Sequence, residues 1–371
     1  MGTLHKTPLH AYHVANKASM VPFCGWDMPL QYQNGVFKEH LATRESAGLF
    51  DVSHMGQVRF RGADREKFVE WVTCADVQAL GEGKARLAVI LNDAGGIKDD
   101  CMVTRHADHV YVVINAGRRD EDLAHFTQKL TEFKGDVSME VDADHGLVAL
   151  QGPNAAKVLG DIGVADLEKV NFMETIFTEV KGVKLRVARC GYTGEDGFEI
   201  AVPNDSCEDF ARTLLANPAV SNVGLGARDS LRLEAGMCLY GNDITEETSV
   251  VHAALQWLIT KRRNDEGGFI GWEATKKIKA NAAELANTRR VGIVSKGLCA
   301  RQGADVLDAE GKKIGTVTSG CPSPTLGGNI AQAYVDVAQI KPGTKVQLQV
   351  RARKVPGEIV RLPFVPSKYK K

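Results

Sequence analysis

Hydrophobic and polar residues alternate along several short stretches of the chain, and this spacing predicts β-strands. In residues 57–62, Val58 and Phe60 alternate with arginines, and in residues 345–350 every second residue is aliphatic. Because successive side chains of a strand point to opposite faces, each stretch is expected to bury one face and expose the other.

Other stretches show the wider spacing of amphipathic helices, and they interleave with the strands. Residues 85–117 contain three strand-like runs separated by Asp-Ala-Gly-Gly and His-Ala-Asp-His turns, which predicts an antiparallel meander. Residues 182–203 predict a hairpin around a glycine-rich turn, whereas residues 21–32 are expected to be rich in turns. Helices are predicted over residues 10–18, 35–48, 63–72, 121–133, 154–163 and 205–217. This interleaving favours α+β layers over a parallel doubly wound sheet.

The chain changes character towards its C-terminal end. Its 371 residues exceed the roughly 250–300 at which a single core stops growing, so two or more domains are expected. Residues 261–290 are dense in charge, and beyond them nearly every stretch resembles a short strand. We therefore predict a first region over residues 1–265, with two interleaved α+β lobes, and a small β-barrel or sandwich over residues 285–371.

Charge and cysteine content narrow the classes of function. The 46 basic and 46 acidic residues cancel, which gives no general attraction to nucleic acid or to an anionic membrane. No apolar run approaches the ~18 residues of a membrane span. The eight cysteines include no C-x-x-C pair, and several lie in apolar runs, so we expect reduced, buried thiols.

Common catalytic and nucleotide-binding motifs are missing. The sequence contains no G-x-x-x-x-G-K-[ST] phosphate loop, no H-E-x-x-H and no G-x-S-x-G, and residues 224–229 only partly resemble a dinucleotide fingerprint. A metal centre and a nucleophilic side chain therefore have no motif support. His54, in a turn-like DVSHMG stretch, has a structural or capping role as its simplest interpretation.

Two adjacent carboxylates, Asp99 and Asp100, follow the Gly-Gly turn inside a predicted strand. Neighbouring strand residues face opposite ways, so one of the two is expected to point inwards. An inward carboxylate is costly unless it has a partner or a task. Strand parity alone does not choose between them.

A second carboxylate, Glu199, lies inside the strand that follows a turn containing Gly191, Gly194 and Gly197. Alternation places it on the face opposite its hydrophobic neighbours, where it faces either solvent or a site. Arg228 is expected in irregular chain just before a helix opened by residue 229 or 230, free to reach a carboxylate bidentately or to form a surface salt bridge. The end of the chain resembles a frayed tail, in which Tyr369 is the residue whose large aromatic side chain would gain from burial.

These stretches, in order with FDVSHMG (50–56), NAG (115–117) and TSGCPSPTLGGNIAQAYV (318–335), resemble the T-protein family of the glycine cleavage system. The resemblance extends from about Thr7 to Tyr369. It implies an α+β fold in which three small lobes form a ring around a central folate site, with a C-terminal β-barrel-like domain as the last lobe.

The resemblance also implies an activity, that of an aminomethyltransferase. Tetrahydrofolate, as co-substrate, takes a methylene group from the aminomethyl unit on the lipoyl arm of the H-protein, and ammonia leaves. No metal takes part. The implied partners are the lipoylated H-protein and, functionally, the P-protein and L-protein, with neither nucleic acid nor membrane.

The functional positions of the family fall on particular residues of this chain. Asp100 is implied as the catalytic residue, and Glu199, Arg228 and Tyr369 are implied in binding. The resemblance places Leu87, Tyr111, Val113, Asn115 and Tyr192 in the lining of the pterin pocket, with His54 and Met55 nearby.

The chemistry of such a site suits these residue types. A carboxylate such as Glu199 accepts two parallel hydrogen bonds from the amino and ring N–H groups of a pterin edge. A fixed carboxylate at Asp100 stabilises positive charge that develops as a thioaminal C–S bond breaks, and it orients a folate nitrogen.

Three alternatives stay open at this point. The chain is similar to folate-binding relatives of iron–sulfur assembly or tRNA modification, although residues 235–243 lack their K-G-C-Y-x-G-Q-E motif. A second alternative is a folate domain detached from a sarcosine- or dimethylglycine-type dehydrogenase, although such an enzyme requires a fused flavin domain, for which 371 residues leave no room. A non-catalytic scaffold for the lipoyl carrier is the third alternative. The SPTLGG segment favours a mitochondrial matrix protein without its leader over a bacterial cytoplasmic one.

Overall fold

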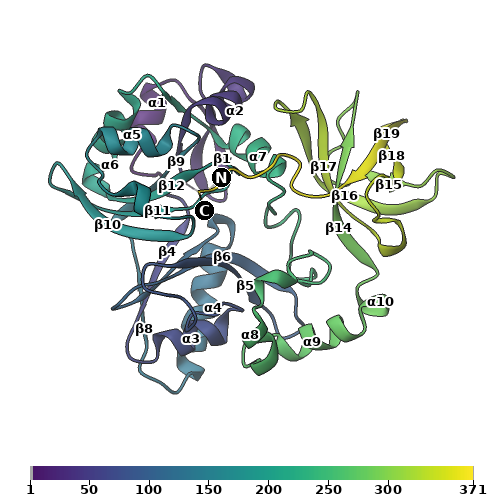
Figure 1. Cartoon of the computed structure of the whole chain (residues 1–371), viewed down its shortest axis with the longest axis horizontal. Coiled ribbons are helices and arrows are strands. Elements are labelled where there is room, and N and C mark those ends of the chain that lie inside the picture. The colour runs from purple at the N-terminus through teal and green to yellow at the C-terminus, as the bar shows by residue number, and fades with distance from the viewer. Residues whose placement is uncertain (1–2, 371) are drawn as a thin grey trace.

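The computed structural model describes residues 3–370, which form three lobes arranged around a common centre (Figure 1). One lobe is built on a six-stranded sheet, one on a five-stranded sheet and one on a closed six-stranded barrel. The predicted fold class, an α+β ring with a C-terminal barrel, is confirmed. None of the helices in the described part of the chain is long and apolar enough to span a bilayer.

The first lobe contains a sheet with the strand order β10-β11-β12-β9-β3-β13. All neighbours are antiparallel except β13 and β3, which are parallel. Its strands are β3 (Ala47–Asp51), β9 (His145–Gln151), β10 (Glu174–Val180), β11 (Val183–Arg189), β12 (Gly197–Pro203) and β13 (Val220–Asn222). Its helices are α1 (His10–Ala15), α2 (Gly35–Glu45), α5 (Ala155–Asp161) and α6 (Asn204–Leu215), with a short 3-10 helix η2 (Leu167–Lys169).

One prediction in this lobe is wrong. Residues 21–32, expected to be rich in turns, belong to a hairpin of β1 (Ser19–Phe23) and β2 (Trp26–Gln31). The stretch contains Pro22 and Pro29, but each strand of a two-stranded ribbon has a free edge, so a proline without an N–H is tolerated there. Cys24 and Gly25 both have positive φ, as the tight turn of a hairpin requires.

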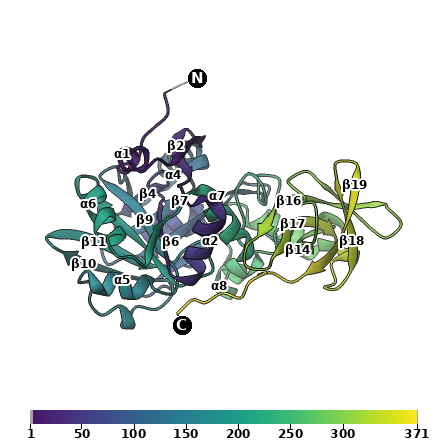
Figure 2. The same ribbon diagram turned by 90° about the horizontal axis from the view of Figure 1, so that it is seen from above.

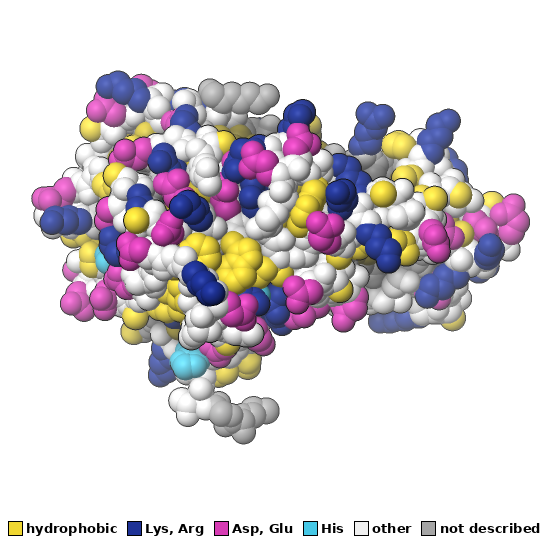
Figure 3. Space-filling model, turned by 90° about the horizontal axis from the view of Figure 1, so that it is seen from below, with side chains coloured by type: hydrophobic (Ala, Val, Ile, Leu, Met, Phe, Trp, Pro, Cys, Tyr) yellow, Lys and Arg dark blue, Asp and Glu magenta, His cyan; other side chains and the backbone are white. Residues whose placement is uncertain are grey.

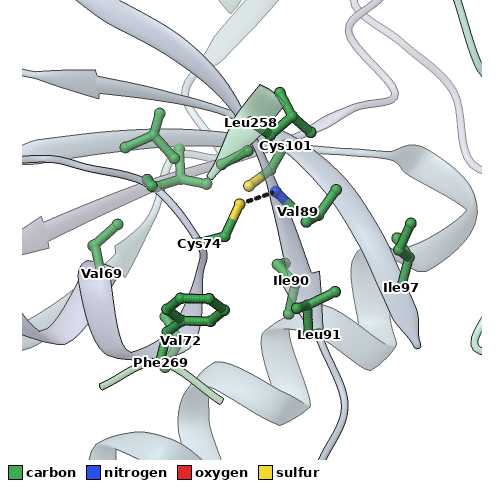
Figure 4. Packing of buried hydrophobic residues seen from close by; sticks show 14 of the residues in the cluster. Val69, Val72, Cys74, Val89, Ile90, Leu91, Ile97, Cys101, Leu258 and Phe269 are labelled. Atoms are coloured by element: carbon green, nitrogen blue, oxygen red, sulfur yellow. Dashed lines mark hydrogen bonds between the residues drawn. The ribbon is translucent and has the colours of Figure 1, made fainter. Parts of the chain in front are cut away.

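The second lobe contains a sheet with the strand order β5-β6-β7-β4-β8, and the predicted antiparallel meander forms its first three strands. Its elements are β4 (Gly56–Arg61), β5 (Ala85–Leu91), β6 (Ile97–Arg105), β7 (Val110–Ile114), β8 (Ser138–Val141), α3 (Arg65–Val72), α4 (Arg119–Glu132) and η1 (Ala116–Arg118). Its core also recruits Leu258 and Phe269, which follow far later in the sequence (Figure 4). In that core the Val89 N–H donates to Cys74 Sγ at 3.4 Å.

The connection to the barrel contains α7 (Leu225–Glu234), η3 (Gln256–Leu258), α8 (Lys261–Glu266), α9 (Trp272–Ala280) and α10 (Ala282–Leu285). The barrel closes in the order β14-β17-β16-β15-β18-β19. Its elements are β14 (Thr288–Ser295), β15 (Asp305–Leu307), β16 (Lys313–Ser323), β17 (Gly328–Asp336), η4 (Val337–Gln339), β18 (Lys345–Val350) and β19 (Arg353–Val360). Val346 and Leu348 point into its core, as their alternation predicts.

After the barrel, the chain returns to the first lobe along the surface of the molecule (Figure 2). The Phe364 and Val365 N–H groups donate to the carbonyl oxygen of Glu234, and the Lys368 N–H donates to that of Gly194 at 2.8 Å. The segment therefore ties the barrel and the first lobe together, whereas the sequence resembled a frayed tail.

The distribution of surface charge and the state of the cysteine thiols agree in most respects with what the composition predicts. Positive and negative side chains are interspersed over the face seen from below, around a group of apolar side chains near its middle (Figure 3). All eight cysteines are free thiols. Five of them are buried, but Cys24 is exposed because it forms the hairpin turn.

Candidate active site

A cavity of about 1320 Å³ lies where the three lobes meet. Its walls come from β5–β7 of the second lobe, β12 and neighbouring loops of the first, α7 with the chain that follows it, and the barrel with the C-terminal segment. Trp257, which is 67% exposed, belongs to the lining and marks a place where the cavity opens to solvent. Ten of the eleven residues predicted in the site or near it line the cavity: His54, Met55, Leu87, Asp100, Val113, Asn115, Tyr192, Glu199, Arg228 and Tyr369.

Tyr111 is the exception, and its expected place in the lining needs correction. It shares a strand face with Val113, but its position two residues earlier puts it between the two sheets, where it is 1% exposed. Its hydroxyl donates to Gln57, and the Arg186 guanidinium lies 3.8 Å from the ring centroid. Tyr111 therefore supports the cavity wall from behind.

The two adjacent aspartates of β6 divide as strand geometry requires. Asp100 lines the cavity, while Asp99 is fully buried on the opposite side of the strand. Asn115, at the end of β7, connects them: its Nδ2 donates to Asp99 Oδ1 and to Asp100 Oδ1, each at 2.9 Å. Burial, followed by the charge of Asp99, raises the pKa of Asp100 to about 7. Asp100 is thus a carboxyl group that exchanges a proton near neutral pH.

Glu199 lies across the cavity on β12, between Phe198 and Ile200, whose side chains are fully buried in the core of the first lobe. The alternation that put Glu199 on the other face was correct, and that face lines the cavity. Glu199 is 9% exposed, so its carboxylate is largely removed from water. Such a group is costly unless a charged or hydrogen-bonding partner compensates.

Arg228 supplies a positive charge near Glu199. Burial lowers the pKa of Arg228, and the negative charge of Glu199 acts in the opposite direction. Its guanidinium lies 4.7 Å from the ring centroid of Tyr192 and 4.0 Å from the Met55 sulfur, and no carboxylate of residues 3–370 forms a salt bridge with it. Arg228 is therefore a partly buried cation able to receive an anionic or carbonyl group.

The expected placement of Arg228 before a helix is wrong, because it lies in the first turn of α7, which begins at Leu225. Gly224 precedes this helix, and its N–H donates to Glu39 Oε2 at 2.9 Å. The group that satisfies the helix start comes from α2, far away in sequence, so no local signal marked the start at residue 225.

Aromatic residues complete the lining. The rings of Tyr369 and Phe172 are stacked, with centroids 4.0 Å apart and planes 10° from parallel. The Tyr192 hydroxyl donates to the carbonyl oxygen of Cys238 and so holds the chain after α7 against the first lobe. Phe172 was missed, since an aromatic residue in a polar loop gives no signal of its role.

His54 also lines the cavity and is 3% exposed. Its Nδ1 is buried without a hydrogen-bonding partner among residues 3–370. Burial lowers the pKa of His54 to about 4, so the imidazole is neutral at physiological pH. In the described part of the chain, no group of three or more His, Cys, Asp or Glu side chains is arranged to hold a metal ion.

Comparisons with known proteins place this architecture in a family. Residues 9–263 match the family described as "GCVT N-terminal domain", and residues 288–366 match "Glycine cleavage T-protein C-terminal barrel domain". A mitochondrial aminomethyltransferase of Dictyostelium discoideum is 45% identical over 99% of this chain and 94% of its own length. That of Mus musculus is 45% identical over 99% of this chain and 91% of its own.

A solved structure gives the same result in three dimensions. The crystal structure of glycine cleavage system aminomethyltransferase T from Bartonella henselae superposes with a TM-score of 0.93. The two chains are 39% identical, and the match covers 99% of this chain and all of the other. The arrangement of three lobes around the cavity is therefore shared with a bacterial protein.

Proposed function

Since the chain belongs to the glycine cleavage T-protein family, we propose that it transfers a methylene group from an aminomethylated lipoyl arm to tetrahydrofolate, with release of ammonia. It is an aminomethyltransferase of the glycine cleavage system, like its relatives along nearly its whole length. The proposal adds the folate co-substrate, the carrier and the residues that act.

The observation that carries the proposal is the placement of Asp100, Glu199 and Arg228 around one cavity. A pterin has a flat ring with an amino group and a ring N–H side by side, and Glu199 offers the matching pair of acceptor oxygens. Leu87 and Val113 supply apolar wall for the ring. Arg228, a partly buried cation without a carboxylate salt bridge in the described chain, suits a carbonyl or carboxylate group of the folate.

Asp100 is the residue to which we assign catalysis. Its carboxylate is fixed by Asn115, so it is held in place before the reaction begins. A fixed negative charge stabilises the positive charge that develops on the aminomethyl carbon as its bond to sulfur weakens. With a pKa near 7, Asp100 is also suited to accept and return a proton.

The remaining assignments concern the protein partners and the cellular compartment. We assign the lipoylated H-protein as carrier of the aminomethyl group, and the P-protein and L-protein as functional associates. The sequence relatives are named mitochondrial, and the similar crystal structure is bacterial. We assign the mitochondrial matrix, with the bacterial cytoplasm as the alternative. Residues 1–265 would hold the folate region and residues 285–371 the barrel domain.

The non-catalytic alternative, a relative that acts in iron–sulfur assembly or tRNA modification, is not favoured. Residues 235–243 read AGMCLYGND and lack the reactive-cysteine motif of those relatives. The relatives that match over nearly the full length are aminomethyltransferases.

The test is a reconstituted reaction with aminomethylated H-protein as donor. Ammonia release should require tetrahydrofolate and be lost when the H-protein carries an unmodified lipoyl arm. Isothermal calorimetry with tetrahydrofolate alone should show one binding site per chain. A protein that binds the H-protein but neither binds folate nor releases ammonia would be a scaffold, and the proposal would be wrong.

A further inference from the structure

Two fully buried carboxyl groups meet behind the active-site strand: Asp99 on β6 and Asp122 in the first turn of α4. They have very different partners. Asp99 accepts hydrogen bonds from the Asn115 N–H and from Asn115 Nδ2, both at 2.9 Å. Among residues 3–370, no N–H or hydroxyl donor reaches either carboxyl oxygen of Asp122.

Two ionised carboxylates in contact inside a protein repel each other, and neither has a proton to donate. The contact becomes a hydrogen bond once one of them is protonated. Burial raises the pKa of Asp99, but the two hydrogen bonds from Asn115 act against burial and stabilise the charged form, whereas Asp122 has no comparable donors. The proton therefore belongs on Asp122. Burial, followed by the charge of Asp99, raises the pKa of Asp122 to about 10 although Arg118 and Lys98 act in the opposite direction.

We infer that Asp122 is a neutral carboxylic acid that donates its proton to a charged Asp99, and that this pair, through Asn115, positions Asp100 and sets its charge state. The inference rests on the proposed function, in which Asp100 acts on the aminomethyl group. Asp122 and Asp99 are positioning residues, since neither lines the cavity.

Asp99 and Asn115 shift the pKa of Asp100 in opposite directions. The charge of Asp99 raises the pKa of Asp100, and the hydrogen bond from Asn115 lowers it. Asp100 acts on the pKa of three nearby groups, Cys101, Tyr192 and Cys238. Burial raises the pKa of each of these three groups, so they stay neutral at physiological pH. The charged residues Arg118, Glu199 and Arg228 line the same cavity as Asp100. Burial is the largest cause of the raised pKa of Asp100, and the opposing effects of Asp99 and Asn115 adjust it.

The protonation of Asp122 is tested by infrared spectroscopy of the full-length protein without substrate. At about pH 8.5, above the pKa of Asp100 and below that of Asp122, the wild type should show the carbonyl stretch of a protonated carboxylic acid. Asp122→Asn should remove the band. Asp120→Asn, an exposed aspartate in the same helical turn, should keep it. A wild type without the band, or a band that persists in Asp122→Asn, would overturn the inference.

The effect on Asp100 is tested by titrating its own carbonyl band, identified as the difference between each protein and the same protein carrying Asp100→Asn. Asp99→Asn removes the charge and should lower the midpoint by about one pH unit or more. Asn115→Ala removes the donor and should raise it. Asp122→Asn should leave the midpoint within about 0.3 unit, because a neutral group replaces a neutral group.

A general structural disturbance would move the Asp99→Asn and Asn115→Ala midpoints in the same direction, and that result would contradict the inference. So would a downward shift in Asp122→Asn, since it would show that Asp122 is charged. If Asp99→Asn does not fold, the wild-type band and the other two variants still decide. These spectra do not depend on catalytic activity. If Asp100 proved unnecessary for catalysis, the proposed function would be wrong, but the spectra would still test the inference about Asp122 and Asp99.

Discussion

The ring of Tyr369 lies parallel to that of Phe172, with centroids 4.0 Å apart, although nearly 200 residues separate them in the chain. Phe172 precedes β10 of the first lobe, and Tyr369 ends the segment that returns from the barrel. Both line the cavity. The last residues of the chain therefore form part of the wall of the site.

This stack predicts how the C-terminal segment contributes to binding. Tyr369→Ala should weaken tetrahydrofolate binding by about 2–10-fold, because an aromatic pair contributes about 0.5–1.5 kcal/mol beyond its buried area. Tyr369→Phe keeps the stack and should retain most of the affinity. Calorimetry with Tyr369→Ala, Phe172→Ala and the double variant measures the coupling, and additive losses would show that the stack plays no part.

A buried carboxylate joins the lobes, and its loss should destabilise the fold. Glu234, at the end of α7, accepts hydrogen bonds from Arg44, His40, Ser323 and Thr325, which come from α2 and from the barrel with the turn that follows β16. Glu234→Ala leaves the Arg44 charge buried without this partner, at a cost of about 3–5 kcal/mol. Thermal unfolding should show a clear drop in midpoint. Glu208→Ala, which removes a surface pair with Arg212, should change it little.

The same residue predicts an acid sensitivity. Burial alone would raise the pKa of Glu234, but its bonds from His40, Ser323 and Thr325 outweigh burial and lower it to about 2. A carboxyl group with a lowered pKa stabilises the fold above the pKa that it has in the unfolded state. This stabilisation is lost as pH falls towards the pKa that it has in the folded state. The difference in unfolding midpoint between wild type and Glu234→Gln should therefore shrink between about pH 4.5 and 2. A constant difference would contradict this assignment.

Glu199 should contribute mainly to folate affinity. Removing a charged acceptor of two hydrogen bonds should weaken binding by about 10–100-fold in Glu199→Ala, measured by calorimetry. Glu179→Ala, on the exposed side of β10, is the matched control and should bind as the wild type does. Unchanged affinity in Glu199→Ala would remove Glu199 from the binding site.

Ionisation of Asp100 should lower the free energy of unfolding as pH rises. Its pKa of about 7, raised by burial and then by Asp99, lies above its unfolded value. Such a group contributes its full stabilisation below the pKa that it has in the unfolded state. This contribution is lost as pH rises through the pKa that it has in the folded state. Asp100→Asn should therefore unfold at a higher temperature than wild type, by an amount that grows from about pH 4 to 7 and then levels off. The gain should be on the order of 1–3 kcal/mol, and a gap that does not change with pH would contradict the raised pKa.

Much of this site could be predicted from periodicity, but only as far as local rules reach. Alternation placed Glu199 opposite Phe198, yet whether that face met solvent or a cavity depended on the lobes across from it. Parity required Asp99 and Asp100 to separate, and the family resemblance, not the pattern, selected Asp100. The helix start before Arg228 was misplaced because Glu39 on α2 satisfies it.

Residues whose role arises from distant contacts gave no local signal. Asp122 resembles an ordinary acidic residue in the first turn of a helix, and only the packing of α4 against β6 brings it to Asp99. Tyr111 and Val113 share a strand face, and only the second sheet decides that one is covered and the other lines the cavity. Tertiary context, not propensity, sets these outcomes.

The central claim is that the Asp100 carboxylate acts on the reacting groups more than on folate binding. The direct measurement compares Asp100→Asn with wild type in two assays, tetrahydrofolate affinity by calorimetry and ammonia release from aminomethylated H-protein, with Asp93→Asn at the exposed β5–β6 turn as control. Affinity should stay within about tenfold while turnover falls by ~10² or more. Equal losses of affinity and turnover, or full turnover in the variant, would contradict it.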